Sequence, residues 1–259
     1  MKIAVIQMNM KKEAPEANFL HAYELLSQAA ENGAEVLILP ETWNTGFFPK
    51  ENLSILADKN GEKTHSLLEK ISRGNGVYIV GGSVTAEKDG KIFNTCYIYN
   101  EKGEHLSSYS KTHLFSPMDE NLYYTAGDNL CVFQLGDIKA AVIICYDLRF
   151  PEIARKLALS GAEILFVPSQ WPIERIKQME ILMKARAVEN QMYVVLCNAA
   201  GAFNETVFGG HSAVCDPLGN VLINAGNEEE IIYCEISTDC VSDVRHKINV
   251  FSDRRTDIY

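Results

Sequence analysis

Positive charge is scarce in this 259-residue sequence. It has 24 lysines and arginines against 34 aspartates and glutamates, a formal net charge of −10, and its basic residues do not cluster. Nucleic acid and acidic membrane surfaces need a positive patch on the protein that binds them. Neither is therefore expected as the main partner, and a small molecule is the expected ligand.

Long apolar runs are missing as well. No stretch reaches the roughly 20 apolar residues that a transmembrane helix needs. The first apolar run, Ile3–Ile6, is too short for the central segment of a signal peptide, and charges return at Lys11 and Lys12. These features predict no membrane association and a cytoplasmic location.

The cysteines follow no regular pattern. There are seven of them, an odd number, and no two form a C-x-x-C pair, which argues against a secreted disulfide scaffold. His113, His211 and His246 lie far apart without the spacing of paired ligands, so no zinc site is expected. The sequence predicts neither a metal nor a cofactor.

No linker rich in Pro, Gly or Ser divides the chain. With 47% hydrophobic residues it can bury a sizeable core, and residues 1–259 are predicted to form a single domain. The final segment, from Asp239 onward, is charged and weakly periodic. It is predicted to be a surface arm or a segment exchanged between subunits of an oligomer.

Short apolar runs alternate with helical patterns, which predicts an α/β fold. A buried strand is expected over residues 3–7 and another over 36–39, and both are apolar enough to be covered by helices. Between them, apolar residues recur at helical spacing and Gly33 closes the pattern. Those residues are Phe19, Tyr23, Leu26 and Ala30.

A similar unit follows later in the chain. A strand over residues 140–144 ends at Cys145, and Pro151 suits the start of a helix. The segments Gly33–Pro40 and Gly161–Pro168 are alike residue by residue, which indicates two related halves. The remaining predictions are a helix over 173–191 and strands over 77–81, 95–99, 106–109, 164–167 and 193–197.

Three chemically distinct side chains fall at or just beyond predicted strand ends: Glu41, Lys111 and Cys145. Ligands of open α/β sheets bind beyond the carboxyl ends of the strands. A carboxylate can take the proton of a thiol nucleophile and later give it to departing ammonia. An ammonium can stabilise the negative charge that forms on the attacked carbonyl. Together the three suit attack on an amide.

Each residue also has an ordinary interpretation. Cys145 could be a buried cysteine at a strand end, Glu41 could cap the following turn, and Lys111 could be a solvated loop lysine. Taken singly, each ordinary interpretation is favoured. The joint pattern favours the catalytic one.

Three segments resemble the signature segments of the nitrilase (carbon–nitrogen hydrolase) superfamily, in the same order. They are Leu39–Glu41, Tyr109–Phe115 and Ile144–Glu152, and weaker similarity continues in 184–191, 193–194, 210–212 and 216–219. The resemblance implies a four-layer α-β-β-α sandwich with two pseudo-symmetric halves. It also implies a homo-oligomer, a dimer or a larger even-numbered assembly.

The resemblance implies a role for each matching residue. Glu41 would be the general base, Lys111 the oxyanion-stabilising lysine and Cys145 the nucleophile that forms a thioester. Glu120 matches a second catalytic glutamate of many members. It lies in a polar run, Asp119–Asn121, so a surface position stays equally open.

The loop around Glu120 is similar to that of bacterial omega-amidases. This implies cofactor-independent hydrolysis of small carboxylate-bearing amides, such as 2-oxoglutaramate to 2-oxoglutarate and ammonia. Two alternatives stay open within the superfamily, an N-carbamoyl-amine or N-carbamoyl-amino-acid hydrolase and a nitrilase. A third is a catalytically idle subunit for binding or assembly, against which the three intact residues weigh.

Residues near Cys145 are candidates for binding the substrate. Arg149 could hold a substrate carboxylate or pair with a structural acid such as Glu152 or Asp147. Tyr146 adjoins the nucleophile, and Trp171 could be pocket wall or packing.

Two further predictions concern structure. His113 is expected to be structural, hydrogen-bonded near the lysine loop. The apolar stripe formed by Ile176, Met179, Met183 and Ala187 is expected to be core or subunit interface.

Overall fold

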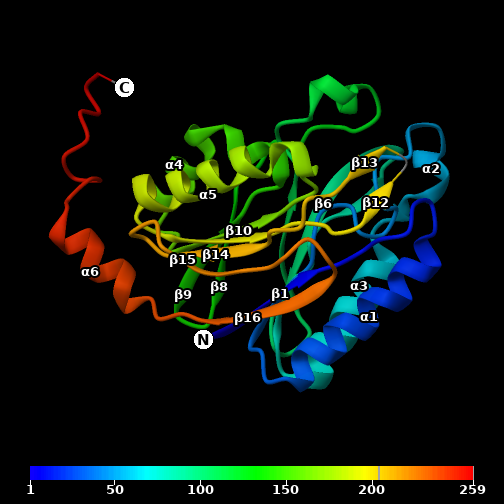
Figure 1. The fold of residues 1–259 in the computed structure, drawn as a ribbon, viewed down its shortest axis with the longest axis horizontal. Helices are drawn as coiled ribbons and strands as arrows, with labels where there is room; N and C mark the ends of the chain where they lie inside the picture. The colour runs from blue at the N-terminus through cyan, green and yellow to red at the C-terminus, as the bar shows by residue number, and fades with distance from the viewer. Residues whose placement is uncertain (204, 259) are drawn as a thin grey trace.

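Two β-sheets pack face to face, and each is covered on its outer side by a pair of helices (Figure 1). The computed structural model describes residues 1–203 and 205–258. Helices α1 (Pro15–Glu31) and α3 (Glu62–Asn75) cover the first sheet. Helices α4 (Pro151–Leu159) and α5 (Ile176–Asn190) cover the second. The predicted four-layer α-β-β-α sandwich is confirmed.

The first sheet has the strand order β16-β1-β2-β4-β6-β5-β3, with β7 also paired to β6. Its parallel centre consists of β1, β2 and β4. The strand bounds are β1 (Lys2–Gln7), β2 (Val36–Ile38), β3 (Asp58–Lys59), β4 (Tyr78–Val80), β5 (Val84–Lys88), β6 (Lys91–Tyr99), β7 (His105–Ser110) and β16 (Glu230–Glu235).

The second sheet has the order β15-β14-β11-β10-β9-β8, with a parallel centre of β9, β10 and β11. The bounds are β8 (Cys131–Leu135), β9 (Ile138–Val142), β10 (Ile164–Pro168), β11 (Tyr193–Cys197), β14 (Ala213–Cys215) and β15 (Val221–Asn224). A separate hairpin pairs β12 (Ala202–Phe203) with β13 (Thr206–Val207).

The two sheets are built on the same plan. In the first, β1 pairs with β16 antiparallel and with β2 parallel; in the second, β9 pairs with β8 antiparallel and with β10 parallel. The amide of Glu35 donates to the carbonyl of Lys2 at 2.8 Å, and that of Glu163 donates to Lys139 at 2.8 Å. The two hydrogen bonds make Lys2 and Lys139 equivalent, which confirms the two pseudo-symmetric halves.

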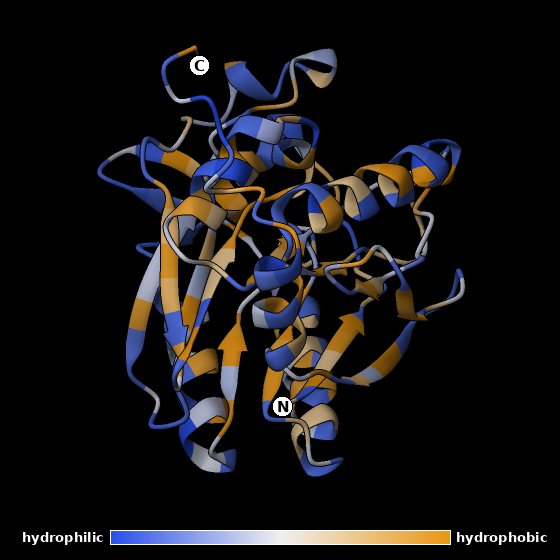
Figure 2. Cartoon of the chain, turned by 90° about the vertical axis from the view of Figure 1, so that its left-hand side faces the viewer, coloured by the Kyte–Doolittle hydropathy of each residue, from blue (hydrophilic) through white to orange (hydrophobic). Residues whose placement is uncertain are grey.

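The core lies in layers because alternate residues of a strand point to opposite faces. Ile3 and Val5 of β1 face the second sheet and join one large apolar cluster, whereas Ala4 and Ile6 join the cluster beneath α1 and α3. Strands buried on both faces need continuous apolar sequence. This need explains the continuous apolar sequences from which the strands were predicted. Figure 2 shows the largely apolar strands between helices that carry many hydrophilic residues.

Most predicted elements are present with shifted ends. The strand before Cys145 ends at Val142, so Ile143 and Ile144 extend beyond it. The predicted helix over 173–191 begins as a separate 3-10 turn, η5 (Ile173–Arg175), before α5. The stripe on α5 is buried within the chain, which confirms the core interpretation.

The C-terminal segment is the one predicted to be a surface arm or a segment exchanged between subunits. Its first part is a helix, α6 (Asp239–Lys247), that packs on its own chain through buried Val241 and Val244. Arg245 donates a hydrogen bond to the carbonyl of Ala162 at 2.7 Å. Only the last residues extend from the body (Figure 1), and Tyr259, the end of the predicted domain, lies outside the described residues.

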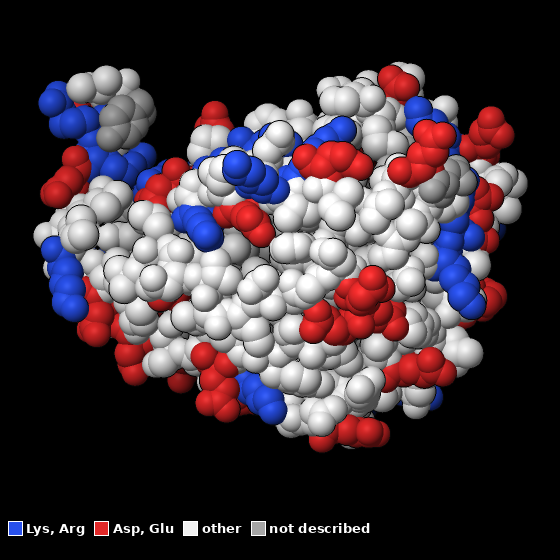
Figure 3. Space-filling view, viewed as in Figure 1, with Lys and Arg blue, Asp and Glu red and all other residues white. Residues whose placement is uncertain are grey.

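Membrane spans and surface charge can be read from the same structure. In the described part of the chain, no helix combines the length and apolar character of a membrane span. On the face shown in Figure 3, acidic and basic side chains are interspersed, and an area without charged side chains crosses the middle.

Candidate active site

Four candidate residues lie just beyond strands or at the start of short turns. Glu41 follows β2 and Lys111 directly follows β7. Cys145 opens the 3-10 turn η4 (Cys145–Arg149), and Glu120 opens η3 (Glu120–Leu122). The structure brings the four side chains together although they are up to 104 positions apart in sequence (145 − 41).

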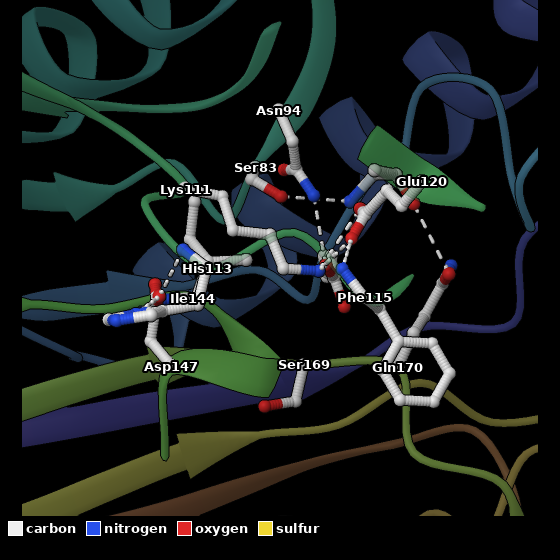
Figure 4. Close-up of polar contacts among 12 residues, drawn as sticks. Ser83, Asn94, Lys111, His113, Phe115, Glu120, Ile144, Asp147, Ser169 and Gln170 are labelled. Carbon is white, nitrogen blue, oxygen red and sulfur yellow. Dashed lines mark hydrogen bonds and ion pairs between the residues drawn. The ribbon is translucent and has the colours of Figure 1, made fainter. Parts of the chain in front are cut away.

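Lys111 lies between two carboxylates. Its Nζ is 2.9 Å from Oε1 of Glu41 and 3.1 and 3.0 Å from the two carboxylate oxygens of Glu120 (Figure 4). The exposed fractions are 4% for Glu41, 3% for Lys111 and 6% for Glu120. The surface interpretation of Glu120 is therefore wrong: its side chain is buried and paired.

Cys145 lies beside this group and, as a whole residue, is half-buried. Burial and the negative charge of Glu41 raise the pKa of Cys145 well above its usual value, against the opposing effect of Lys111. Burial alone would lower the pKa of Lys111, but the neighbouring carboxylates outweigh it and raise that pKa well above its usual value. The surroundings therefore favour the charged form of Lys111 and the protonated form of the Cys145 thiol.

The local charge explains this protonation. A thiolate at Cys145 would add a negative charge beside the carboxylate of Glu41 in a buried site, where charge is costly. A nucleophile in this setting needs its proton removed as it attacks. Glu41 is close enough to the thiol for its charge to raise the pKa of Cys145.

Three positions at the site adopt left-handed backbone conformations that non-glycine residues rarely occupy. Cys145 has a φ of 46°, Thr42 beside Glu41 has 43°, and Asp119 beside Glu120 has 60°. Such conformations cost free energy and persist only where the surrounding structure holds them. Their clustering here indicates that the fold constrains the directions of these side chains.

A buried aspartate joins the segment that carries Lys111 to the one that carries Cys145. The carboxylate of Asp147 is fully buried and accepts hydrogen bonds from Tyr109 Oη at 2.7 Å and from the Ile144 amide at 2.9 Å. It also accepts from the amide of His113 at 2.9 Å and contacts His113 Nδ1 at 2.7 Å (Figure 4). The predicted structural role of His113 fits this network.

A cavity of about 240 Å³ opens above the thiol, large enough for a small organic molecule. All predicted binding residues, Tyr146, Arg149 and Trp171, line it. The aromatic residues along its wall are Phe47, Phe48, Phe115, Tyr124, Tyr146 and Trp171.

Arg149 pairs with neither of the acids considered above. Its guanidinium donates to Gln178 Oε1 at 2.7 Å and lies 4.6 Å from the centre of the Trp171 ring. The carboxylate of Asp147 is instead occupied by the network around Tyr109 and His113. The alternative of a structural acid partner is therefore wrong.

Trp171 belongs to the pocket wall and is only 3% exposed. Its backbone amide donates to Asn198 Oδ1 at 2.7 Å, which fixes the residue in place. Among the described residues, its buried indole N–H has no hydrogen-bond partner. A buried donor of this kind is uncommon, and here the ring adjoins the cavity.

Asn94 is a site residue that the sequence analysis missed. Its Nδ2 donates to Oε1 of Glu41 at 2.9 Å, the oxygen that also binds Lys111. Strands β6 and β7 pair in register from Ile98 and Ser107 outward, and the amide of Lys111 donates to the carbonyl of Asn94. A register shift between Ile98 and Tyr99 separates this pairing from the turn around Gly103, so counting outward from the turn does not by itself pair Asn94 with Lys111.

The fold and this site define a class of enzymes that use a cysteine, a lysine and glutamates on an α-β-β-α sandwich. The family model of carbon-nitrogen hydrolases matches residues 2–246. The chain belongs to this family, and the resemblance to the nitrilase superfamily is confirmed.

Individual relatives agree. A 2-oxoglutaramate amidase of Bacillus subtilis is 40% identical over 257 residues, covering 99% of this chain and 98% of the relative. An omega-amidase of Danio rerio is 34% identical, covering 100% and 96%. A solved variant of the amidase from Nesterenkonia sp. AN1 has a TM-score of 0.84 and 28% identity, covering 96% and 98%, and contains acrylamide added to its active-site cysteine.

Proposed function

We propose that this protein is an omega-amidase that hydrolyses small carboxylate-bearing amides, such as 2-oxoglutaramate to 2-oxoglutarate and ammonia, without a cofactor. The observation that carries the proposal is the buried Glu41–Lys111–Glu120 group beside the thiol of Cys145, at the base of a small-molecule cavity. The names of the relatives supply the substrate class.

The first half of the reaction forms a thioester. Glu41 takes the proton of the Cys145 thiol as sulfur attacks the amide carbon. The carbonyl oxygen becomes negatively charged and is stabilised by the ammonium of Lys111. When the intermediate collapses, the carbon–nitrogen bond breaks, and Glu41 gives its proton to the departing nitrogen, which leaves as ammonia.

The second half releases the acid. Glu41, again ionised, takes a proton from a water molecule that attacks the thioester carbon. The carbon–sulfur bond breaks, the sulfur recovers the proton from Glu41, and the product leaves as a carboxylic acid that ionises. No electron donor or acceptor is needed.

Glu120 is proposed to hold Lys111 in place and to keep it charged. Its two oxygens share the ammonium with Glu41, and its Oε2 accepts a hydrogen bond from the amide of Phe115. Tyr146, Arg149 and Trp171 are proposed to contact the substrate from the cavity wall. The unpaired indole N–H of Trp171 suits an oxygen of the substrate.

A panel assay distinguishes this function from its rivals. Ammonia release should be fastest from omega-amides of 2-oxo acids and slower from N-carbamoyl compounds and nitriles. Carbon dioxide released together with ammonia would identify an N-carbamoyl hydrolase instead. No turnover of any compound would favour a catalytically idle binding or assembly subunit.

We also propose that residues 1–259 act as one domain and that the protein self-associates as a dimer or larger even-numbered assembly in the cytoplasm. The support is two apolar side chains on the outer side of α5, Ile181 and Val188, which are exposed in the single chain beside Lys177 and Lys184. A second subunit packed on this helix would cover them. Sedimentation of a stable 28.9 kDa monomer at micromolar concentration would refute the association.

A further inference from the structure

An omega-amide substrate has its amide at one end and a carboxylate at the other. If the amide lies at Cys145, the carboxylate needs a cation farther along the cavity. Of the described residues that line the cavity, three carry a positive charge: Lys111, Arg149 and Arg175. Lys111 is already shared by two carboxylates, so the choice is between the two arginines.

Arg149 is restrained by the protein. One of its nitrogens donates to Gln178 at 2.7 Å, and its guanidinium stacks on Trp171. These contacts hold it against the wall that it shares with Trp171. Part of its hydrogen-bonding capacity is thereby used within the protein.

Arg175 is different. Its guanidinium lies 5.2 Å from the ring centre of Phe115, and its side chain makes no hydrogen bond or ion pair within residues 1–203 and 205–258. It is half-buried and lines the cavity. A partly desolvated guanidinium without an anionic partner favours binding an anion, and its planar shape matches a carboxylate in a bidentate pair.

The position of Arg175 is fixed from two directions. It ends the short turn η5, whose preceding residue Pro172 is bridged to Phe208. The ring beneath it, Phe115, belongs to the loop whose backbone amide donates to Glu120. The guanidinium of Arg175 therefore contacts the same loop that donates a backbone hydrogen bond to Glu120.

Besides Glu41 and Glu120, two more acidic residues line the cavity, Glu174 and Glu205. Both are exposed, so water and salt screen their charges.

We propose that Arg175, rather than Arg149, binds the far carboxylate of the substrate and selects monoanionic omega-amides over neutral ones. This specificity role rests on the proposed amidase function. Arg149 then shapes the wall together with Trp171.

The test measures kcat and KM for 2-oxoglutaramate and for butyramide, a neutral amide without the carboxylate. Arg175→Gln should raise KM for 2-oxoglutaramate by about 10- to 100-fold, the size expected for a lost charge-assisted hydrogen bond. Its kcat should change little, and butyramide kinetics should not change. Arg175→Lys should recover part of the loss.

Two matched variants sharpen the result. Arg149→Gln removes the same charge from the neighbouring wall and should raise KM for 2-oxoglutaramate less than Arg175→Gln does. Glu174→Gln removes a negative charge from the residue next to Arg175 and should lower KM for the anion.

The outcomes separate the inference from the function on which it rests. Equal losses on both amides, an unchanged KM for 2-oxoglutaramate in Arg175→Gln, or a larger effect of Arg149→Gln would overturn the role of Arg175. If the wild-type protein instead prefers N-carbamoyl compounds to any oxo-amide, the proposed function itself fails.

Discussion

The two halves of the molecule place different residues at equivalent positions. The carbonyls of Lys2 and Lys139 accept corresponding hydrogen bonds, so these two residues are equivalent. Counting six residues onward from each, Met8 of the first half corresponds to Cys145 of the second. In the same way, Val36 and Ile164 occupy matching register positions, and Glu41 corresponds to Ser169. Each half therefore has one side chain with a proposed catalytic role and one without such a role at these places.

The comparison distinguishes positions that only build the fold from positions with a proposed catalytic role. Met8 and Ser169 are fully buried, and the hydroxyl of Ser169 donates to the nearby carbonyl of Val167. In both halves, the equivalent strands end in the same region between the halves. The side chain at each strand end is proposed to determine whether that position takes part in catalysis. Substitutions at equivalent positions of the two halves can test this proposal.

The largest effect is expected at the Cys145–Met8 pair. Cys145→Ala should reduce turnover by several orders of magnitude, because the nucleophile and its partners act as a unit. Met8→Leu, a swap of similar volume, should cost less than about 1.5 kcal/mol of stability and leave kcat nearly unchanged. Ammonia release and thermal unfolding measure both, and comparable activity losses in the two variants would contradict the comparison.

Lys111→Ala should follow in size. Loss of an oxyanion-stabilising group typically lowers kcat by about two to three orders of magnitude. The change also leaves Glu41 and Glu120 buried without their cation, which should cost about 3–5 kcal/mol of stability. Denaturant unfolding and steady-state kinetics test the two expectations. A variant as stable as the wild type would contradict a stabilising role of the ion pairs between Lys111 and the two carboxylates.

Glu41→Gln and Ser169→Ala form the next pair. Glu41→Gln should lose most of its turnover, since an amide cannot accept the thiol proton, whereas Ser169→Ala should stay within a few-fold of the wild type. The negative charge of Glu41 contributes to raising the pKa of Cys145. Its removal should therefore lower that pKa and increase the thiolate fraction at a given pH.

Alkylation of Cys145 as a function of pH measures this shift. In the wild type, the thiol is protonated at neutral pH because its pKa is raised, so the alkylation rate should still rise as the pH increases above 8. In Glu41→Gln the rise should begin at lower pH, although turnover falls. A wild-type rate that is already constant near pH 7 would contradict the protonated thiol.

The smallest effect is expected at Trp171, away from the reacting atoms. Trp171→Phe keeps an aromatic wall but removes the indole N–H. If that donor meets a substrate oxygen, KM for 2-oxoglutaramate should rise by about three- to tenfold, as for a neutral hydrogen bond, with kcat preserved. An unchanged KM would assign Trp171 to packing alone.

The sequence predicted the parts of the fold that depend on strong local patterns. The strands β1, β2 and β10 are buried on both faces, so their apolar runs are unmistakable. Helix α3 was missed because buried polar residues, Thr64 and Ser72, dilute its apolar stripe. The helix α6 was missed because only two of its residues are buried.

The site was predicted where its residues end or follow such strands and match family segments. The burial of Glu120 could not be predicted, since it depends on the chain folding back after Phe115 so that a polar run meets Lys111. The position of Arg175 likewise depends on the contact between η5 and Phe115, residues 60 apart in sequence (175 − 115). Tertiary contacts of this kind leave no local pattern.

The central claim is that Cys145 forms a thioester with the acyl group of the substrate while its pseudo-equivalent, Met8, is only packing. Rapid quenching of the protein with 2-oxoglutaramate, followed by intact mass and peptide mapping, tests this directly. The account predicts a mass increase equal to the acyl group, located on Cys145 and removed by hydroxylamine. Steady turnover with no adduct on Cys145, or an adduct on another residue, would contradict it.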